Sequence, residues 1–265
     1  MSASPPCPFC GAPSEAFARA TVLGRHEAVY VRCVRCRSVH VPDPYWLDEA
    51  YADAIAATDI GLPSRSVWTS QMTALVIRLF FPHATRFCDH GGGPGLFVRL
   101  MRDAGYDFRW SDPFATNEFA RVFDAKPLDQ FDLTTAFEVL EHLRDPHALL
   151  DEVLVRSPAL LLTTELLPDE TPDPHAWWYY SLATGQHISF PTQLGLRSLA
   201  NAHGLQVTSA GEVHLLAPRR VSSRRLMLAK SRPASRLAAG WSARPSLLGA
   251  DYDTVVHETA SRSLS

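Results

Sequence analysis

The feature that most constrains the fold is a glycine-rich turn between a short apolar strand and an apolar helix. Residues 85–88 (TRFC) are predicted to form the strand, and residues 96–101 (LFVRLM) carry apolar side chains at helical spacing. Between them lies DHGGGPG, residues 89–95, a D-x-G-x-G-x-G pattern. Glycine permits positive φ and a close approach of the backbone to a ligand, and the first N–H groups of the next helix can bind that ligand. The unit therefore predicts an α/β fold with a ligand at the turn.

Three later features agree with such a fold. Asp112 follows a second predicted strand, 108–111, where an acidic side chain can accept hydrogen bonds from ribose hydroxyls. Residues 130–137 are predicted to form a buried strand that leads directly into EVLEHLRDP, residues 138–146. Residues 158–164 form a further short apolar segment, which we predict to be the next strand.

These features occur together, in the same order and spacing, in the class I S-adenosylmethionine-dependent methyltransferases, which the chain resembles over roughly residues 70–215. The resemblance implies an α/β, Rossmann-like, seven-stranded methyltransferase sheet with helices on both faces. An NAD-binding domain, with its related glycine pattern, and a turn without a ligand are the alternatives. The segment FDLxxxxEVLEHLxDP, residues 131–146, is not part of the nicotinamide pattern and favours the methyltransferase.

The same resemblance implies how S-adenosylmethionine (SAM) would be bound. The glycines would pass under its methionine part, one carboxylate would hold its amino group and another its ribose diol, and an aromatic ring would lie beside its adenine or sulfonium. The glycines are Gly91, Gly93 and Gly95. The carboxylate at the amino group is Asp89, the one at the ribose is Asp112, and the aromatic ring is Phe137.

Four cysteines form two C-x-x-C pairs near the N-terminus, Cys7 with Cys10 and Cys33 with Cys36. Two such pairs can supply the tetrahedral sulfur ligands that zinc prefers, and four thiolates leave no open position for catalysis. We therefore expect a structural zinc in a zinc-ribbon-like module. A redox motif, disulfides or chance are the alternatives, and disulfides are rare in cytoplasmic proteins. Cys88 is expected to be a buried core residue.

The first group of candidate catalytic residues is Glu138, Glu141 and His142, which could share one face of a helical turn. Glu-x-x-Glu-His with a later histidine resembles the metal site of small-RNA 2′-O-methyltransferases. The EVLEHL segment also begins the helix after the fourth strand in relatives without a metal, and this second interpretation is favoured. Whether a catalytic divalent metal binds here stays open.

The second candidate is His187, in the segment GQHISF that follows an aromatic cluster at residues 177–180 (WWYY). The segment resembles one in methyltransferases that act on sugars and secondary metabolites, and it is expected above the cofactor cleft. A histidine can take a proton from an acceptor hydroxyl, although a structural role is equally open. The aromatic cluster could stack on a sugar or anchor a lid.

Four parts are expected along the chain: the ribbon-like module (1–44), a helical cap (45–81), the SAM-binding core (82–232) and a C-terminal tail (233–265). Within them, helices are predicted near residues 45–60, 66–81 and 192–203. Strands six and seven of the sheet are predicted to include residues 206–208 and 225–229.

Charge and composition limit the partners. The formal net charge is −3 at pH 7, which argues against a general preference for nucleic acid, and 46% of the residues are hydrophobic, as expected for a folded core. No apolar run reaches the ~20 residues that span a bilayer, and no secretory signal is evident, so we expect a cytoplasmic protein. Residues 213–250 contain eight basic and no acidic side chains. A solvated surface explains them better than a rim for a phosphorylated substrate, which is the alternative.

We therefore predict an enzyme that methylates a small-molecule acceptor, with a sugar, a nucleotide-linked glycan (a nucleotide-sugar) or a secondary metabolite as the leading class, by O- or C-methylation. An RNA ribose 2′-O-methyltransferase and a non-catalytic zinc-ribbon adaptor are the alternatives. The sequence leaves open the acceptor, the atom that is methylated and the oligomeric state.

Overall fold

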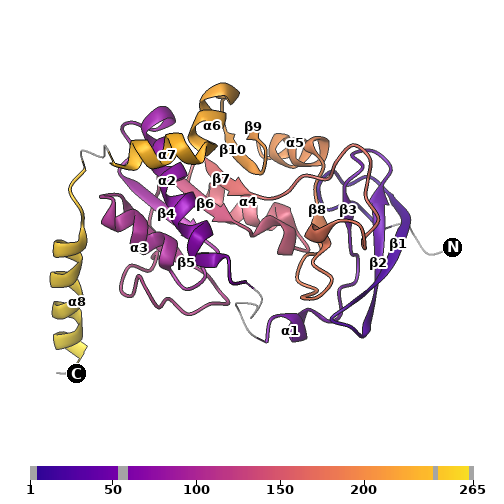
Figure 1. The fold of residues 1–265 in the computed structure, drawn as a ribbon, viewed down its shortest axis with the longest axis horizontal. Coiled ribbons are helices and arrows are strands. Elements are labelled where there is room, and N and C mark those ends of the chain that lie inside the picture. Colours follow the sequence, from indigo (N-terminus) through magenta and orange to yellow (C-terminus); the bar gives the residue numbers. More distant parts are fainter. Residues whose placement is uncertain (1–4, 53–58, 241–243, 263–265) are drawn as a thin grey trace. The chain divides into compact units, whose positions relative to one another are not determined.

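The computed structural model of the chain describes residues 5–52, 59–240 and 244–262 (Figure 1). Its strands form a four-stranded sheet, β1-β2-β3-β8, and a six-stranded sheet, β5-β4-β6-β7-β10-β9. The chain divides into two compact units. Unit 1 comprises Met1–Ala56, Phe137–Val155 and Leu162–Arg220, and unit 2 comprises Ala57–Ala136, Arg156–Leu161 and Val221–Ser265.

The four-stranded sheet belongs to unit 1 and begins with a hairpin of β1 (Ser14–Val22) and β2 (His26–Cys33). The short strand β3 (Val39–His40) adds to β2, and β8 (Ser189–Phe190) adds to β3, both in the antiparallel direction. Ser189, two residues after His187, therefore belongs to the same sheet as the hairpin that carries Cys33.

Aromatic side chains fill the core beside this sheet. Tyr30, Tyr180 and Phe190 are fully buried, with the Tyr30 and Tyr180 rings 5.1 Å apart. Trp46 joins the same cluster and donates from its indole N–H to the carbonyl of Gly185 over 2.9 Å. Of the helix predicted at residues 45–60, the structure shows α1 (Leu47–Ala50), and residues 53–58 lie outside the described part of the chain.

Unit 1 also contains two well-capped helices. Asp145 caps α4 (Pro146–Leu154) by accepting from the N–H of His147 over 2.9 Å. Thr192 caps α5 (Gln193–Ala202) by accepting from the N–H of Gly195 over 3.0 Å. These caps satisfy N–H groups that have no partner within the helix. The Thr192 cap explains why α5 begins next to residue 192, where the sequence predicts a helix to start.

In unit 2, β4 (Arg86–His90) pairs in parallel with β5 (Asp107–Ser111) and with β6 (Leu133–Phe137). The helices α2 (Leu62–Phe80) and α3 (Leu96–Asp103) pack against each other. Helix α2 begins at Leu62, four residues before the helix predicted at residues 66–81. The earlier start is possible because Pro63 stands in the first turn of α2, where its missing N–H leaves no hydrogen bond unmade.

The large sheet continues through β7 (Leu160–Thr163) and ends in the antiparallel pair β9 (Gln206–Ala210) and β10 (Val213–Ala217). The predicted α/β fold is therefore confirmed, with a mixed sheet. The described residues give this sheet six strands, whereas seven were predicted. The strand predicted at residues 225–229 was wrong: it is part of helix α6 (Ser223–Lys230), which the Ser222 side chain caps and which buries Leu226 and Ala229 three residues apart.

Two more helices, α7 (Arg232–Gly240) and α8 (Leu248–Arg262), complete the described chain. The described helices include none with the length and apolarity that crossing a bilayer requires.

Candidate functional site

The glycine turn in unit 2 has the backbone that its sequence predicts. Gly91, Gly93 and Gly95 have φ values of 70°, 51° and 83°, and Gly95 forms the N-cap of α3. A Cβ atom at Gly95 would lie 2.5 Å from the side-chain oxygen of Asn117, which leaves no room for a larger residue. The turn thus leads closely into the N-terminus of a helix, whose first N–H groups suit an anionic or polar ligand.

Asp112 braces this turn. Its Oδ2 accepts from the N–H of Gly93 over 2.9 Å, and its Oδ1 accepts from the N–H groups of Phe114 and Ala115 over 2.8 and 3.0 Å. A carboxylate has about four acceptor sites, so one more hydrogen bond can still be accepted. The sequence predicted a ligand-binding role for Asp112 but gave no sign of this bracing role.

Asp89 lies at the carboxyl end of β4 and is buried, and its Oδ1 accepts from the hydroxyl of Thr135 over 2.6 Å. Burial raises the pKa of Asp89 to about 7, the Thr135 hydrogen bond opposes this rise, and the nearby charge of Asp112 adds to it. A cationic amino group beside Asp89 would stabilise the carboxylate and lower this pKa again. The site is therefore chemically suited to an ammonium group.

The other predicted cofactor residue, Phe137, ends β6 and is half-buried. The residue after it, Glu138, has a left-handed φ of 54°, which is uncommon outside glycine and asparagine. Its Oε1 accepts from the Thr163 hydroxyl over 2.8 Å, and its backbone N–H donates to the oxygen of that hydroxyl over 3.1 Å. Such strain persists where the surrounding contacts hold it, often at functional sites.

A cluster of Glu141, His142 and His187 forms the polar centre of unit 1. One potential ligand atom from each residue lies within 4.8 Å of those of the other two. Glu138 was predicted to share a face with Glu141 and His142, but it is not a member of this group. The third member is His187 instead. Its ring lies edge-on to the ring of His142, with the two ring centroids 4.8 Å apart.

A hydrogen bond determines which ring nitrogen of His187 carries the proton. Its Nδ1–H donates to the carbonyl oxygen of Tyr179 over 2.7 Å. Burial lowers the pKa of His187 below its ordinary value, an effect opposed by the Tyr179 carbonyl and the charge of Glu138. A neutral imidazole with its proton on Nδ1 has a lone pair on Nε2, which can accept a proton or bind a metal.

Two tyrosines support the cluster: Tyr179, from the aromatic segment that the sequence singled out, and Tyr51, which sequence analysis did not select. The Tyr179 hydroxyl donates to Glu141 Oε1 over 2.5 Å, and the Tyr51 hydroxyl lies 2.8 Å from Nδ1 of His142. Tyr179 and Tyr180 of the aromatic segment are buried and anchor it, whereas Trp178 is exposed. No local pattern marks Tyr51, because its partner lies 91 residues away in the sequence.

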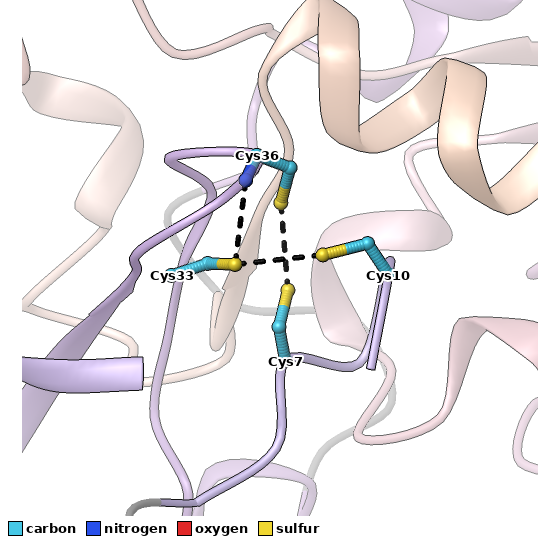
Figure 2. Close-up of side chains that lie close together, drawn as sticks. All are labelled: Cys7, Cys10, Cys33 and Cys36. Carbon is cyan, nitrogen blue, oxygen red and sulfur yellow. Dashed lines mark hydrogen bonds between the residues drawn. The ribbon is translucent and has the colours of Figure 1, made fainter. Parts of the chain in front are cut away.

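The four N-terminal cysteines converge in unit 1, as Figure 2 shows. The Sγ atoms of Cys7 and Cys36 are 3.5 Å apart, as are those of Cys10 and Cys33. A disulfide needs about 2.05 Å, which these distances exclude. A tetrahedral zinc site with ~2.3 Å bonds places its sulfur atoms about 3.8 Å apart. The donor set and its spacing therefore fit zinc. The fifth cysteine, Cys88, is buried in β4, as expected.

The mixed α/β sheet and the glycine turn define a Rossmann-like protein. A family described as "Methyltransferase domain" matches residues 67–210, more than half of the chain. The chain therefore belongs to this methyltransferase family, as its sequence motifs predicted.

Solved structures with a similar fold include human N-acetylserotonin methyltransferase in complex with SAM. It is 20% identical, with 58% of this chain and 52% of that chain covered and a TM-score of 0.44, so the chain spans about half of that enzyme's length. An O-methyltransferase family protein from Burkholderia thailandensis is 16% identical, with 68% and 69% covered and a TM-score of 0.45. Magnesium protoporphyrin IX methyltransferase from Synechocystis PCC 6803 with bound SAM is 14% identical, with 66% and 88% covered and a TM-score of 0.39. No curated protein matches the chain in sequence.

Proposed function

We propose that this enzyme methylates a hydroxyl group of a small molecule, with a sugar, a nucleotide-linked glycan or a secondary metabolite as the acceptor class and His187 as the general base. The observation that carries the proposal is the hydrogen bond from His187 Nδ1 to the Tyr179 carbonyl. Together with burial, this bond supports a neutral imidazole whose Nε2 can accept a proton. In the proposed role, the acceptor oxygen would attack the methyl carbon, the bond from that carbon to the SAM sulfur would break and leave S-adenosylhomocysteine, and the hydroxyl proton would pass to Nε2.

Unit 2 would bind SAM. In this proposal the backbone around Gly91, Gly93 and Gly95 receives the methionine part, and the remaining acceptor site of Asp112 binds the ribose diol. Asp89 would receive the amino group, whose positive charge compensates the cost of ionising a buried carboxyl. That Phe137, at the end of β6, lies beside the adenine or the sulfonium stays a prediction from the sequence. SAM supplies an activated methyl group, so the protein contributes mainly positioning and the base.

The four-cysteine module would have a structural task. Four thiolates complete the coordination of zinc, so the metal would have no open position for a substrate. Zinc would also add the stability that a segment of about 45 residues lacks by itself. We place the zinc ligands at Cys7, Cys10, Cys33 and Cys36.

A second mode of acceptor binding is favoured by one observation, the convergence of Glu141, His142 and His187 within 4.8 Å. Two imidazoles and a carboxylate suit a divalent transition metal, which could bind an acceptor through oxygen atoms. Activity after chelation separates the two modes. Full turnover with EDTA, while elemental analysis shows that zinc stays bound to the four cysteines, supports His187 as a base. Loss of turnover that added Mn²⁺ restores supports the metal.

The test of the proposed function is calorimetric titration of the zinc-loaded protein with SAM and S-adenosylhomocysteine, followed by an acceptor screen. We expect micromolar binding that Asp112→Ala abolishes, because this substitution also removes the brace of the turn. The screen should contain sugars, nucleotide-sugars, phenolic metabolites and a short RNA, so that ribose 2′-O-methylation is tested in the same assay. Absence of binding to both cofactor forms would favour the adaptor alternative.

A further inference from the structure

The C-terminal helix α8 is held to the rest of unit 2 at its first turn. Asp251 is buried there, and its two carboxylate oxygens accept from Nη2 and Nε of Arg102 in α3 over 2.6 and 2.8 Å. The N–H of Leu247 also donates to the carbonyl of Arg102 over 3.1 Å. From Tyr252 to Thr259 every side chain is exposed or half-buried. Helices of this length are marginal in water without tertiary packing, so α8 needs a surface that covers its apolar face.

That apolar face is a regular ridge. Leu248, Tyr252 and Val256 recur at every fourth position, which places them on one side of the helix. All three are exposed, and Tyr252 is 69% accessible to solvent. Acidic side chains flank the ridge on both sides, with Asp253 on one side and Glu258 on the other. The helix thus presents an apolar stripe with negative charge along its borders.

The helices α6 and α7 present the matching surface. They bury Leu226, Ala229 and Ser235 and pack against α2, and they leave Met227, Leu228 and Leu237 exposed. The basic side chains of Arg224, Arg225 and Arg236 stand exposed in the same two helices. No acidic residue occurs between residues 213 and 250. This surface is therefore apolar and positively charged, the complement of α8.

We propose that α8 of one copy of this chain packs on α6 and α7 of a second copy, with the reciprocal contact closing a twofold homodimer. The two complementary surfaces occur in the same chain, which is what a self-complementary interface requires. An anionic membrane would match the basic surface but would repel the acidic α8 and leave its ridge uncovered. A second copy covers both surfaces at once, and charge complementarity fixes which pair of surfaces meets.

Sedimentation velocity of the full zinc-loaded chain over a range of micromolar concentrations tests this proposal. We expect a dimer for the unmodified protein and at least tenfold weaker association for Arg224→Glu with Arg225→Glu, and for Asp253→Lys with Glu258→Lys. A tenfold change corresponds to about 1.4 kcal/mol. The chain that carries all four substitutions should dimerise again, because the charges are exchanged rather than lost. Arg197→Glu, an exposed position in α5, is the matched control and should leave association unchanged.

Circular dichroism and SAM titration of each variant show whether its fold is intact. A monomeric unmodified protein at all concentrations would overturn the proposal, as would a dimer that neither charge reversal weakens. A monomer that binds vesicles containing phosphatidylserine, and loses this binding with Arg224→Glu and Arg225→Glu, would assign the basic surface to a membrane instead.

Discussion

The backbone N–H of Val41 donates to the carbonyl oxygen of Ile188, the residue that follows His187, over 2.9 Å. Four residues further along the chain, the Thr192 hydroxyl donates to the carbonyl of Cys36 over 2.5 Å. These two hydrogen bonds add to the β3–β8 pairing and attach the segment that carries His187 to the four-cysteine module. Because both attachments use backbone atoms of the module, its folding fixes the path of this segment.

This attachment predicts that loss of the zinc site damages acceptor chemistry more than cofactor binding. We expect Cys36→Ser to lower the zinc content and to reduce kcat. The melting temperature should fall by about 10 °C, equivalent to a few kcal/mol in a protein of this size. The Kd for SAM should stay within about threefold, because the glycine turn belongs to unit 2. Elemental analysis, thermal denaturation and calorimetry measure these quantities.

The matched control for this experiment is Cys88→Ser, which alters a buried cysteine in β4 outside the cluster. It should cost stability through packing but leave the zinc content unchanged. One outcome would contradict this prediction: Cys36→Ser loses all its zinc, Cys88→Ser keeps all of it, and both variants lose the same fraction of kcat. The module would then not position the His187 segment.

The state of His187 predicts a specific pH profile. Burial lowers its pKa, so the neutral form that can act as a base persists below the usual value of about 6.5. We expect kcat/KM for the acceptor, measured with saturating SAM so that Asp89 does not contribute, to be flat above pH 6.5 and to fall only at more acidic pH, where the imidazole becomes protonated. His187→Ala should lower kcat by about 10²- to 10⁴-fold, the range for loss of a general base, and should abolish this acidic limb.

For comparison, His175→Ala removes an exposed histidine and should change neither kcat nor the profile. Wild-type turnover in His187→Ala would remove His187 from the mechanism. An acidic limb that persists in this variant would assign the titration to another group.

Local patterns predicted most of the fold, and long-range contacts account for what they missed. The glycine turn and the cysteine pairs are encoded by neighbouring residues, so their conformations followed from the sequence. In the structure His187 joins Glu141 and His142, Glu138 has a left-handed backbone, and the Tyr179 carbonyl accepts from the His187 ring. None of these features has a signature at the sequence level.

The error at the end of the sheet has a different origin. Short apolar runs are ambiguous between strand and helix, and RLMLA (225–229) was assigned to a strand for that reason. The strand that does pair with β9 is β10, in which all five residues are buried, including His214. This histidine lies 2.9 Å from the Ser209 hydroxyl and 3.1 Å from the Thr164 carbonyl, partners that a sequence pattern does not reveal.

Asp89 predicts a conflict between stability and cofactor binding. Its pKa is raised from 3.8 to about 7, chiefly by burial, so the folded state is penalised when the carboxyl ionises. Its contribution to stability is greatest below pH 3.8 and is lost as the pH rises to about 7. We expect Asp89→Asn to raise the free energy of unfolding by a few kcal/mol at pH 8, and by progressively less toward pH 4.

The same substitution should weaken SAM binding about tenfold or more, because the amino group loses its countercharge. Urea denaturation at pH 5 and pH 8, with calorimetry at pH 8, tests both expectations. Equal effects on stability at the two pH values would show that Asp89 does not titrate in this window. Unchanged SAM affinity would remove it from the proposed cofactor site.

The glycine turn offers a test that separates backbone strain from steric exclusion. Gly95 and Gly204 both have positive φ, at 83° and 73°, so alanine is strained at either position. An added Cβ at Gly95 would also meet Asn117 at 2.5 Å, whereas at Gly204 nothing lies within 4 Å. Gly204→Ala should therefore cost about 1 kcal/mol of stability and leave SAM binding intact. Gly95→Ala should cost about 2–4 kcal/mol and reduce SAM affinity at least tenfold, because the turn must move away from Asn117. Urea denaturation and calorimetry of both variants provide the comparison. If Gly95→Ala loses no more affinity for SAM than Gly204→Ala does, the turn does not contact the cofactor.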